Sequence, residues 1–234
     1  MIAFGLTDKG HIRKSNEDSF LCCKRRNLFV VADGMGGHVA GEVASKVAIQ
    51  TINARLCHDV IENCNENLYQ AVLEANTEVY SMSTENNEYD GMGTTLTAVL
   101  IDDAKAYINH VGDSRAYLIR QGGINLLTKD HSLVSELVRS GQITSKEAES
   151  HPQKHMLTRA LGTSPIVKVD RLEYDLAPQD YIVLCTDGLT NHVSEQLILE
   201  VIKNNEIHRA AESLVNMALE EGGLDNITVI IVKV

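Results

Sequence analysis

The sequence has 234 residues, of which 44% are hydrophobic and only 3 are proline. This composition supports a substantial core, and without a linker-like or repeated segment we expect one domain over residues 1–234. The formal net charge of −11 disfavours a nucleic-acid surface and an anionic membrane surface.

Cellular context is indicated by three further features. The N-terminus lacks a basic region followed by a long apolar stretch, and no apolar stretch reaches the roughly 20 residues that span a bilayer. The five cysteines form no CxxC pair, and their odd number is typical of a reduced chain. None is followed six residues later by arginine, which excludes a cysteine phosphatase loop. We therefore expect a cytoplasmic protein that binds neither membrane nor nucleic acid, and a monomer.

Apolar alternation and short apolar runs predict strands, whereas apolar spacings of three and four predict helices. The strands expected on this basis cover residues 2–6, 27–32, 94–101, 104–111, 115–120, 167–174, 181–187 and 226–232. The helices expected cover residues 40–51, 66–82, 132–140, 194–203 and 207–220, and a capping box at Thr144 opens another short helix. Strands and helices come in blocks instead of alternating. This order predicts an α+β fold of antiparallel sheets with helices on their outer faces.

Acidic motifs follow the predicted strands along the whole chain. They are Asn16-Glu17-Asp18, Asp33-Gly34-Met35-Gly36-Gly37-His38, Gly112-Asp113-Ser114-Arg115, Thr186-Asp187-Gly188 and Asp225-Asn226-Ile227-Thr228. Strand ends hold side chains rigidly, as a metal site requires. Oxygen ligands without cysteine or histidine pairs indicate hard cations, Mg²⁺ or Mn²⁺. Several carboxylates around such ions are typical of two-metal hydrolysis, commonly of phosphate esters.

Each of these acids also has a plainer interpretation. Asp-Gly and Asp-Asn favour turns and helix N-caps, and for any single motif that interpretation is preferred. Together, however, Asp33, Asp187 and Asp225 supply three separate carboxylates, enough for two hydrated ions. Asp113 follows a glycine between two strands, so a hairpin turn competes with a metal role.

Two basic side chains near the acids also have two interpretations each. Arg13 lies five residues before Asp18 and either clamps phosphate oxygens or is a solvated surface charge. His38 either donates a proton to a leaving group or simply begins a helix. His110, His131, His151 and His155 lack metal-ligand spacing and are expected to be structural or exposed to solvent.

Taken in order, the motifs resemble those of the metal-dependent protein phosphatases of the PP2C type (PPM family). The chain is most similar to the short bacterial Ser/Thr phosphatases that consist of the catalytic domain alone. The resemblance covers essentially all residues and adds three glycine- and arginine-containing segments to the acids above. The complete ordered set is Arg13…Asn16-Glu17-Asp18, Ala32–His38, Gly91–Thr95, Gly112–Arg115, Leu157–Gly162, Thr186–Leu189 and Asp225–Thr228.

The resemblance implies a sandwich of two antiparallel sheets flanked by helices, with a metal centre. In that family pattern Asp33 bridges two ions, and the carbonyl of Gly34 binds the first. Asp187 and Asp225 match ligands of the second ion. Asp113, with Asp187, matches the ligands of a third ion in bacterial members. The expected cofactors are therefore two Mn²⁺ or Mg²⁺ ions, with a possible third.

The resemblance also implies roles around the metals. Glu17 and Asp18 act mainly through metal-bound waters, and Arg13 binds the phosphate. His38 is the expected proton donor, although the animal enzymes carry their histidine earlier in the turn, where this chain has Met35. Residues 140–163 match the mobile flap beside the site. Leu224 is bulkier than the small or polar residue expected before the last aspartate.

The implied activity is hydrolysis of phosphoserine and phosphothreonine in proteins by a metal-activated water. The implied partners are phosphorylated proteins, including a bacterial Ser/Thr kinase that this enzyme counteracts. Two alternatives are a phosphatase dedicated to anti-anti-sigma factors and a pseudophosphatase that only binds. The pseudophosphatase interpretation predicts loss of metal-binding acids, yet Asp33, Asp187 and Asp225 are all present.

Overall fold

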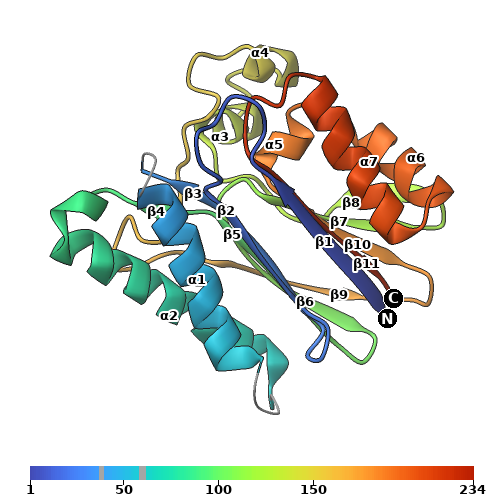
Figure 1. The fold of residues 1–234 in the computed structure, drawn as a ribbon, viewed down its shortest axis with the longest axis horizontal. Helices are drawn as coiled ribbons and strands as arrows, with labels where there is room; N and C mark the ends of the chain where they lie inside the picture. Colours follow the sequence, from blue (N-terminus) through green and yellow to red (C-terminus); the bar gives the residue numbers. More distant parts are fainter. Residues whose placement is uncertain (37–39, 58–61) are drawn as a thin grey trace.

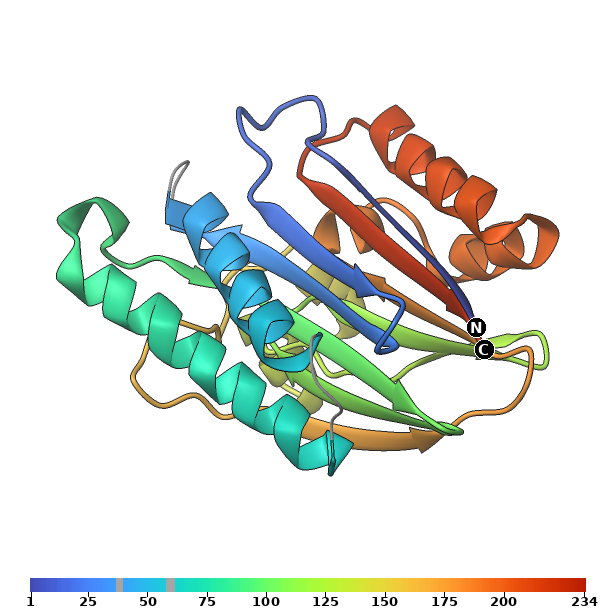
Figure 2. The same cartoon turned by 60° about the horizontal axis from the view of Figure 1, so that its bottom comes forward.

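Two antiparallel sheets stack face to face, and pairs of helices cover their outer faces (Figure 1). The computed structural model describes residues 1–36, 40–57 and 62–234. The arrangement of the two sheets and their helices confirms the predicted α+β sandwich. Figure 2 shows both chain ends at the same end of the molecule, because the first and last strands lie side by side and antiparallel.

The first sheet has the strand order β1-β11-β10-β7-β8. Its strands are β1 (Ile2–Asp8), β7 (Arg115–Arg120), β8 (Gly123–Leu126), β10 (Tyr181–Cys185) and β11 (Ile227–Lys233). The second sheet has the order β2-β3-β5-β6-β9, with the short β4 paired to β3. Its strands are β2 (Asp18–Cys23), β3 (Leu28–Met35), β4 (Gly93–Thr94), β5 (Leu96–Asp102), β6 (Lys105–Val111) and β9 (Asp170–Asp175).

The longest helices cover the two outer faces. α1 and α2 pack on the second sheet, and α6 and α7 pack on the first. Shorter helices lie near one end of the sandwich. The helix bounds are α1 (Ala40–Leu56), α2 (Cys64–Glu85), the 3-10 helix η1 (Asn87–Tyr89), α3 (Leu133–Arg139), α4 (Ser145–Glu149), α5 (Asp187–Thr190), α6 (Glu195–Asn204) and α7 (Ile207–Glu220).

The core has three layers because the central strands are buried on both faces. In β11, Val229 and Ile231 pack with α6 and α7, whereas Ile230 and Val232 point between the sheets. This alternation follows from the two-residue period of a strand. A continuous apolar run such as Ile227–Val232 is the expected sequence of such a strand.

The structure corrects several local predictions. The strands β2 and β8 were not expected, and β10 ends at Cys185, so that Asp187 begins the helix α5. β6 and β7 belong to different sheets, which makes the turn that carries Asp113 a crossing between sheets and not a hairpin. α3 contains no fully buried residue, although its apolar side chains were expected to face inward. Val134 and Val138 of α3 instead line a polar cavity, described below.

Candidate active site

The predicted acids converge on one cavity of about 610 Å³. They come from the loop before β2, from β3, from the turn between the sheets, from the start of α5 and from the loop before β11. Arg13 and Gly34 line the same cavity. The acidic residues that line it are Glu17, Asp33, Asp113, Asp187 and Asp225. We call this space the acidic cavity. His38 lies outside the described residues, so its expected role stays a prediction.

Strand pairing brings the first two acids together. Asp18 begins β2 and lies opposite Asp33 of β3 in the antiparallel register. The Asp33 amide donates to Thr95 Oγ1 at 2.9 Å, and its carbonyl accepts from Thr94 Oγ1 at 2.9 Å. These backbone bonds fix the part of β3 that carries the Asp33 carboxylate.

Asp18 is buried under the cavity and only 6% exposed. Its Oδ2 accepts hydrogen bonds from Thr186 at 2.8 Å and from Thr228 at 2.6 Å. Its Oδ1 is buried and has no partner. Burial, together with the charges of Asp187 and Asp225, raises the pKa of Asp18 to about 7 despite these two bonds.

Asp187 is held by the first turn of α5. Asn191, one turn later, donates to its Oδ2 at 3.1 Å, whereas its Oδ1 is buried without a partner. Burial, and after it the charge of Asp225, raises the pKa of Asp187. The sequence predicted Asp187 as the last residue of a strand, whereas the structure places it at the start of α5.

Asp225 lies at the mouth of the cavity and pairs with Arg13, whose Nη2 is 2.8 Å from the carboxylate Oδ2. The next residue, Asn226, organises the loop that carries Arg13. Its side-chain oxygen accepts from the Glu17 amide at 2.8 Å, and its amide nitrogen donates to the carbonyls of Lys9 and Ser15 at 2.8 and 3.0 Å. Asn226 therefore fixes the N-terminal loop against β11.

Close backbone packing at glycine positions completes the acidic wall. A Cβ atom on Gly34 would lie 2.0 Å from the Gly41 carbonyl oxygen, and one on Gly41 would lie 2.1 Å from Glu17 Oε2. Both distances are far below van der Waals contact, so only glycine allows α1 to approach β3 and Glu17 this closely. The Glu17 side chain is consequently buried against the start of α1.

The carboxylates in the acidic cavity lie close together, so their ionised forms need positive charge nearby to be stable. Burial and the neighbouring Asp18 and Asp187 hold the pKa of Asp33 well above its usual range. Burial and Asp187 raise the pKa of Asp113 to about 8. Such shifts report carboxylates crowded together with too little compensation.

The donor set fits hard divalent cations. Carboxylate oxygens and a backbone carbonyl are the ligands such ions prefer, and two buried carboxylate oxygens here lack any partner. Among the described residues, no three acidic, histidine or cysteine side chains form a ready-made coordination shell. The acids line a shared space instead, an arrangement that suits ions keeping several waters.

Comparison with known sequences decides the family. The sequence profile of the family described as Protein phosphatase 2C matches residues 8–221. This chain belongs to the protein phosphatase 2C family. The serine/threonine phosphatase Stp of Listeria monocytogenes is 39% identical over 97% of this chain and 93% of its own length. The family resemblance inferred from the ordered motifs is confirmed.

Solved structures of family members agree in fold. The Ser/Thr phosphatase PstP of Mycobacterium tuberculosis superposes with a TM-score of 0.93 at 36% identity, covering 100% of this chain and 98% of that one. A PstP catalytic domain solved in complex with two manganese ions gives a TM-score of 0.90 at 35% identity, covering 98% and 96%. The protein is thus a PP2C-type serine/threonine phosphatase, and the metal dependence expected from its acids is that of the family.

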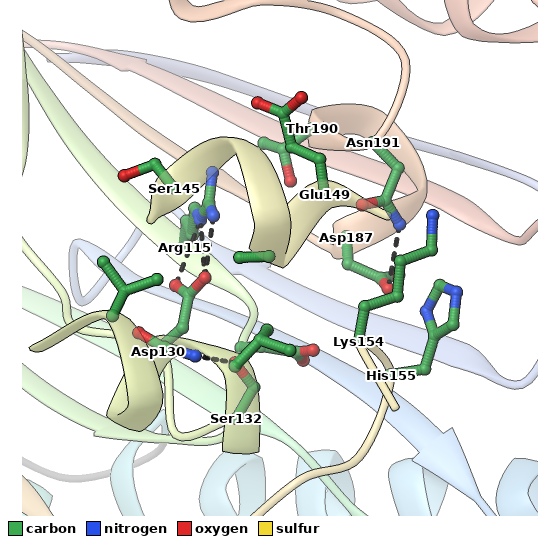
Figure 3. A pocket seen from close by; sticks show the side chains of 15 residues that line it. Arg115, Asp130, Ser132, Ser145, Glu149, Lys154, His155, Asp187, Thr190 and Asn191 are labelled. Carbon is green, nitrogen blue, oxygen red and sulfur yellow. Dashed lines mark hydrogen bonds and ion pairs between the residues drawn. The ribbon is translucent and has the colours of Figure 1, made fainter. Parts of the chain in front are cut away.

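A second, polar cavity of about 580 Å³ adjoins the acidic cavity (Figure 3). The two share the lining residues Asp113, Lys154, His155, Asp187 and Asn191. Residues of α3 and α4 and the start of the predicted flap, 140–163, form its other wall. Lys154, His155 and Leu157, which belong to this predicted flap, also line the acidic cavity.

Arg115 and Asp130 form the wall of this polar cavity opposite Lys154 (Figure 3). Arg115 Nε lies 3.0 Å from Asp130 Oδ1, and its Nη2 lies 2.7 Å from Oδ2, a bidentate pair. Because Asp130 occupies the guanidinium in this way, Arg115 is a structural charge and not a phosphate clamp.

Buried histidines connect the flap to the turn that carries Asp113. His131 is 1% exposed, and its Nδ1 accepts from the Gly112 amide at 3.1 Å. This bond places the proton of neutral His131 on Nε2, which lies 3.2 Å from Asp170 Oδ2. Arg159 of the flap donates to the same carboxylate at 2.8 Å. Of the two roles expected for His131, structural or exposed to solvent, the structure shows the structural one.

In the part of the chain that the structure describes, no helix has both the length and the apolar content needed to cross a membrane.

Proposed function

We propose that the acidic cavity is the catalytic centre of this serine/threonine phosphatase and that it acts on phosphorylated proteins. The observation that carries the proposal is the convergence of five acidic side chains on one cavity, where the crowding of Asp33, Asp113 and Asp187 calls for positive charge. Two divalent cations, Mn²⁺ or Mg²⁺, would supply that charge.

The proposed ligands follow from position in the cavity. Asp33, the Gly34 carbonyl, Asp187 and Asp225 would hold the two ions, because all four line the acidic cavity. Asp113 lines both cavities, beside Asp187, and with it would hold a third ion.

Glu17 and Asp18 lie at and beneath the same wall and would act through waters. Thr186 and Thr228 engage Oδ2 of Asp18, which leaves the unpartnered Oδ1 to accept from such a water.

When bound, the ions lower the pKa of an attacking water and offset charge on the phosphate oxygens. The protein supplies binding and orientation. Arg13 uses one of its N–H groups on Asp225, and other donors of its planar guanidinium can reach a phosphate at the cavity mouth. Asp225 therefore both restrains Arg13 and keeps it beside the metal-binding acids.

The leaving Ser or Thr oxygen needs a proton. His38 is the proposed donor, because the glycine turn that follows Asp33 carries it. His155, which lines both cavities, is the described histidine to compare with it.

The wider biological role is also a proposal. We infer a cytoplasmic, monomeric enzyme of one catalytic domain, residues 1–234, with a flap at residues 140–163. Its substrates would include a bacterial Ser/Thr kinase and that kinase's phosphorylated targets. The net charge of −11 supports the expectation that nucleic acid and anionic membranes are not partners.

The test is hydrolysis of a phosphothreonine peptide with Mn²⁺, with excess EDTA, and by the Asp187→Asn variant. Activity should require the metal and should fall by at least about 100-fold in the variant, because a charged ligand is lost. Asp103→Asn is the matched control. Asp103 is exposed in the turn between β5 and β6 at φ 50°, a conformation that asparagine adopts readily.

The outcomes separate catalysis from binding alone. Metal-dependent turnover that survives in Asp103→Asn and collapses in Asp187→Asn supports the proposal. Bound Mn²⁺ without turnover in the wild type would identify a pseudophosphatase instead. Full activity of Asp187→Asn would remove Asp187 from the metal centre.

A further inference from the structure

An exposed leucine stands at the mouth of the acidic cavity. Leu224 is 57% exposed, lines the cavity and directly precedes Asp225. Neither metal binding nor phosphate binding has a use for an aliphatic side chain. Its size was unexpected at this position from the sequence, and the structure shows that it projects to solvent where a substrate enters.

A second exposed aliphatic side chain belongs to the neighbouring loop. The His11 amide donates to the Gly223 carbonyl at 2.8 Å, and Arg13 pairs with Asp225 at 2.8 Å. The N-terminal loop and the loop before β11 therefore lie side by side, as both ribbon views show (Figures 1 and 2). Ile12, between these two contacts, is 65% exposed.

The predicted flap contributes a third exposed apolar side chain. Met156 is 49% exposed and lies between His155 and Leu157, which both line the acidic cavity. We call Ile12, Met156 and Leu224 the apolar rim. Each of its members is adjacent in sequence to a residue of the cavity wall.

The two loops that carry Ile12 and Leu224 are held firmly against each other. A Cβ atom on Gly223, which has φ 53°, would lie 2.9 Å from the His11 ring, so the two loops are in close contact. Asn226 holds the same two segments together through Lys9 and Ser15. Leu224 and Ile12 are thus presented by an ordered base and not by a free loop.

Position distinguishes this rim from ordinary exposed apolar residues, which are common on any surface. The floor of the cavity is made of acids that would hold the metal ions, whereas its rim offers aliphatic surface. A phosphorylated side chain that reaches the floor must bring its neighbours in the polypeptide to the rim. Aliphatic neighbours would gain burial there, and charged or small ones would not.

Resting on the proposed function of the acidic cavity, we propose that the apolar rim selects phosphorylated segments with an aliphatic residue next to the phosphothreonine or phosphoserine. The occupant is the substrate polypeptide itself. Leu224 and Ile12 are specificity-determining residues, and they take no part in the chemical step.

The test compares two phosphothreonine peptides that differ only in the residues flanking the phosphothreonine, leucine in one and serine in the other. The enzymes are the wild type, Leu224→Ser, Ile12→Ser and the control Ile166→Ser. Ile166 is 84% exposed but lies in the segment beside α2, where Asn76 donates to the Ser164 carbonyl at 3.1 Å. Hydrolysis of p-nitrophenyl phosphate, which has no flanking residues, normalises the active enzyme in each preparation.

The wild type should prefer the leucine peptide by about 5- to 20-fold in kcat/KM, the range expected for partial burial of aliphatic groups. Leu224→Ser and Ile12→Ser should each lower this ratio at least about threefold, chiefly through KM, while Ile166→Ser keeps the wild-type ratio.

A wild-type ratio near one, or an unchanged ratio in both rim variants, overturns the proposal. Loss of p-nitrophenyl phosphate hydrolysis in the wild type with Mn²⁺ would instead refute the proposed catalytic centre, and the rim proposal with it. The small substrate thereby separates the two failures.

Discussion

Asp18→Asn should stabilise the metal-free protein. The substitution keeps the shape of a side chain that is 6% exposed and removes its buried charge. The asparagine oxygen can accept from Thr186 and Thr228 as Oδ2 does now. Its amide would replace Oδ1, which has no partner, and can donate to neighbouring carboxylates.

The magnitude follows from the pKa of Asp18, which is raised from 3.8 to about 7. Because the folded value lies above the unfolded one, the native state binds the proton more tightly. Protonated Asp18 therefore stabilises the folded state. This contribution is complete below about pH 4 and is lost as the pH rises from there to about 7. At about 1.36 kcal/mol per pKa unit the full loss is about 4 kcal/mol.

The neighbouring carboxylates titrate together with Asp18. We therefore expect Asp18→Asn to recover about half of this loss, which raises the free energy of unfolding by about 2 kcal/mol. For a chain of this size that corresponds to a rise in Tm of about 4–8 °C. The assay is calorimetry in EDTA at pH 8, at pH 6 and at pH 4, with Asp103→Asn as the control.

The gain should shrink as the pH falls toward 4, because Asp18 then carries a proton in the folded state and no longer buries a charge. Added Mn²⁺ should raise the Tm of the wild type more than that of Asp18→Asn, since the variant offers less negative charge to the ions. The reasoning is refuted if the Tm of Asp18→Asn in EDTA at pH 8 is equal to or below that of the wild type. Burial of the Asp18 charge would then not limit the stability of the metal-free protein.

Three other substitutions test the site. Arg13→Ala should lower kcat/KM for p-nitrophenyl phosphate about 10- to 100-fold, and retention of wild-type values would show that Arg13 does not bind phosphate. His131→Phe should cost about 2–4 kcal/mol in urea denaturation, because the Gly112 amide and Asp170 each lose a buried partner; an unchanged midpoint contradicts this. His38→Gln should lower kcat about 100-fold or more and should abolish the decline of kcat at high pH. If only His155→Gln alters the pH profile of kcat, His155 is the proton donor instead of His38.

The sequence alone determined the chemistry of the site. Acids at the ends of apolar runs, without cysteine or histidine pairs, indicated hard cations before any coordinates were considered. The capping box at Thr144 was also correctly predicted, because both of its hydrogen bonds join residues three apart. Such features depend on residues near in sequence.

Local pattern was insufficient for several elements. β2 is rich in apolar residues on both faces and so short that no alternation marks it. The apolar side chains of α3 have helical spacing, but Val134 and Val138 line a cavity instead of a core. β6 and β7 look like a hairpin in sequence, yet they belong to different sheets. Periodicity specifies which residues share a face but not what covers that face.

Only the tertiary structure decided which residues meet. The bonds from Thr186 and Thr228 to Asp18 join residues 168 and 210 positions apart. No spacing in the sequence predicts these bonds, because Thr228 on its own is an ordinary strand residue and Thr186 an ordinary residue before a helix. The stacking of two sheets brings β2, β10 and β11 together at one end, and that convergence turns separate acids into one site and makes Leu224 and Ile12 its rim.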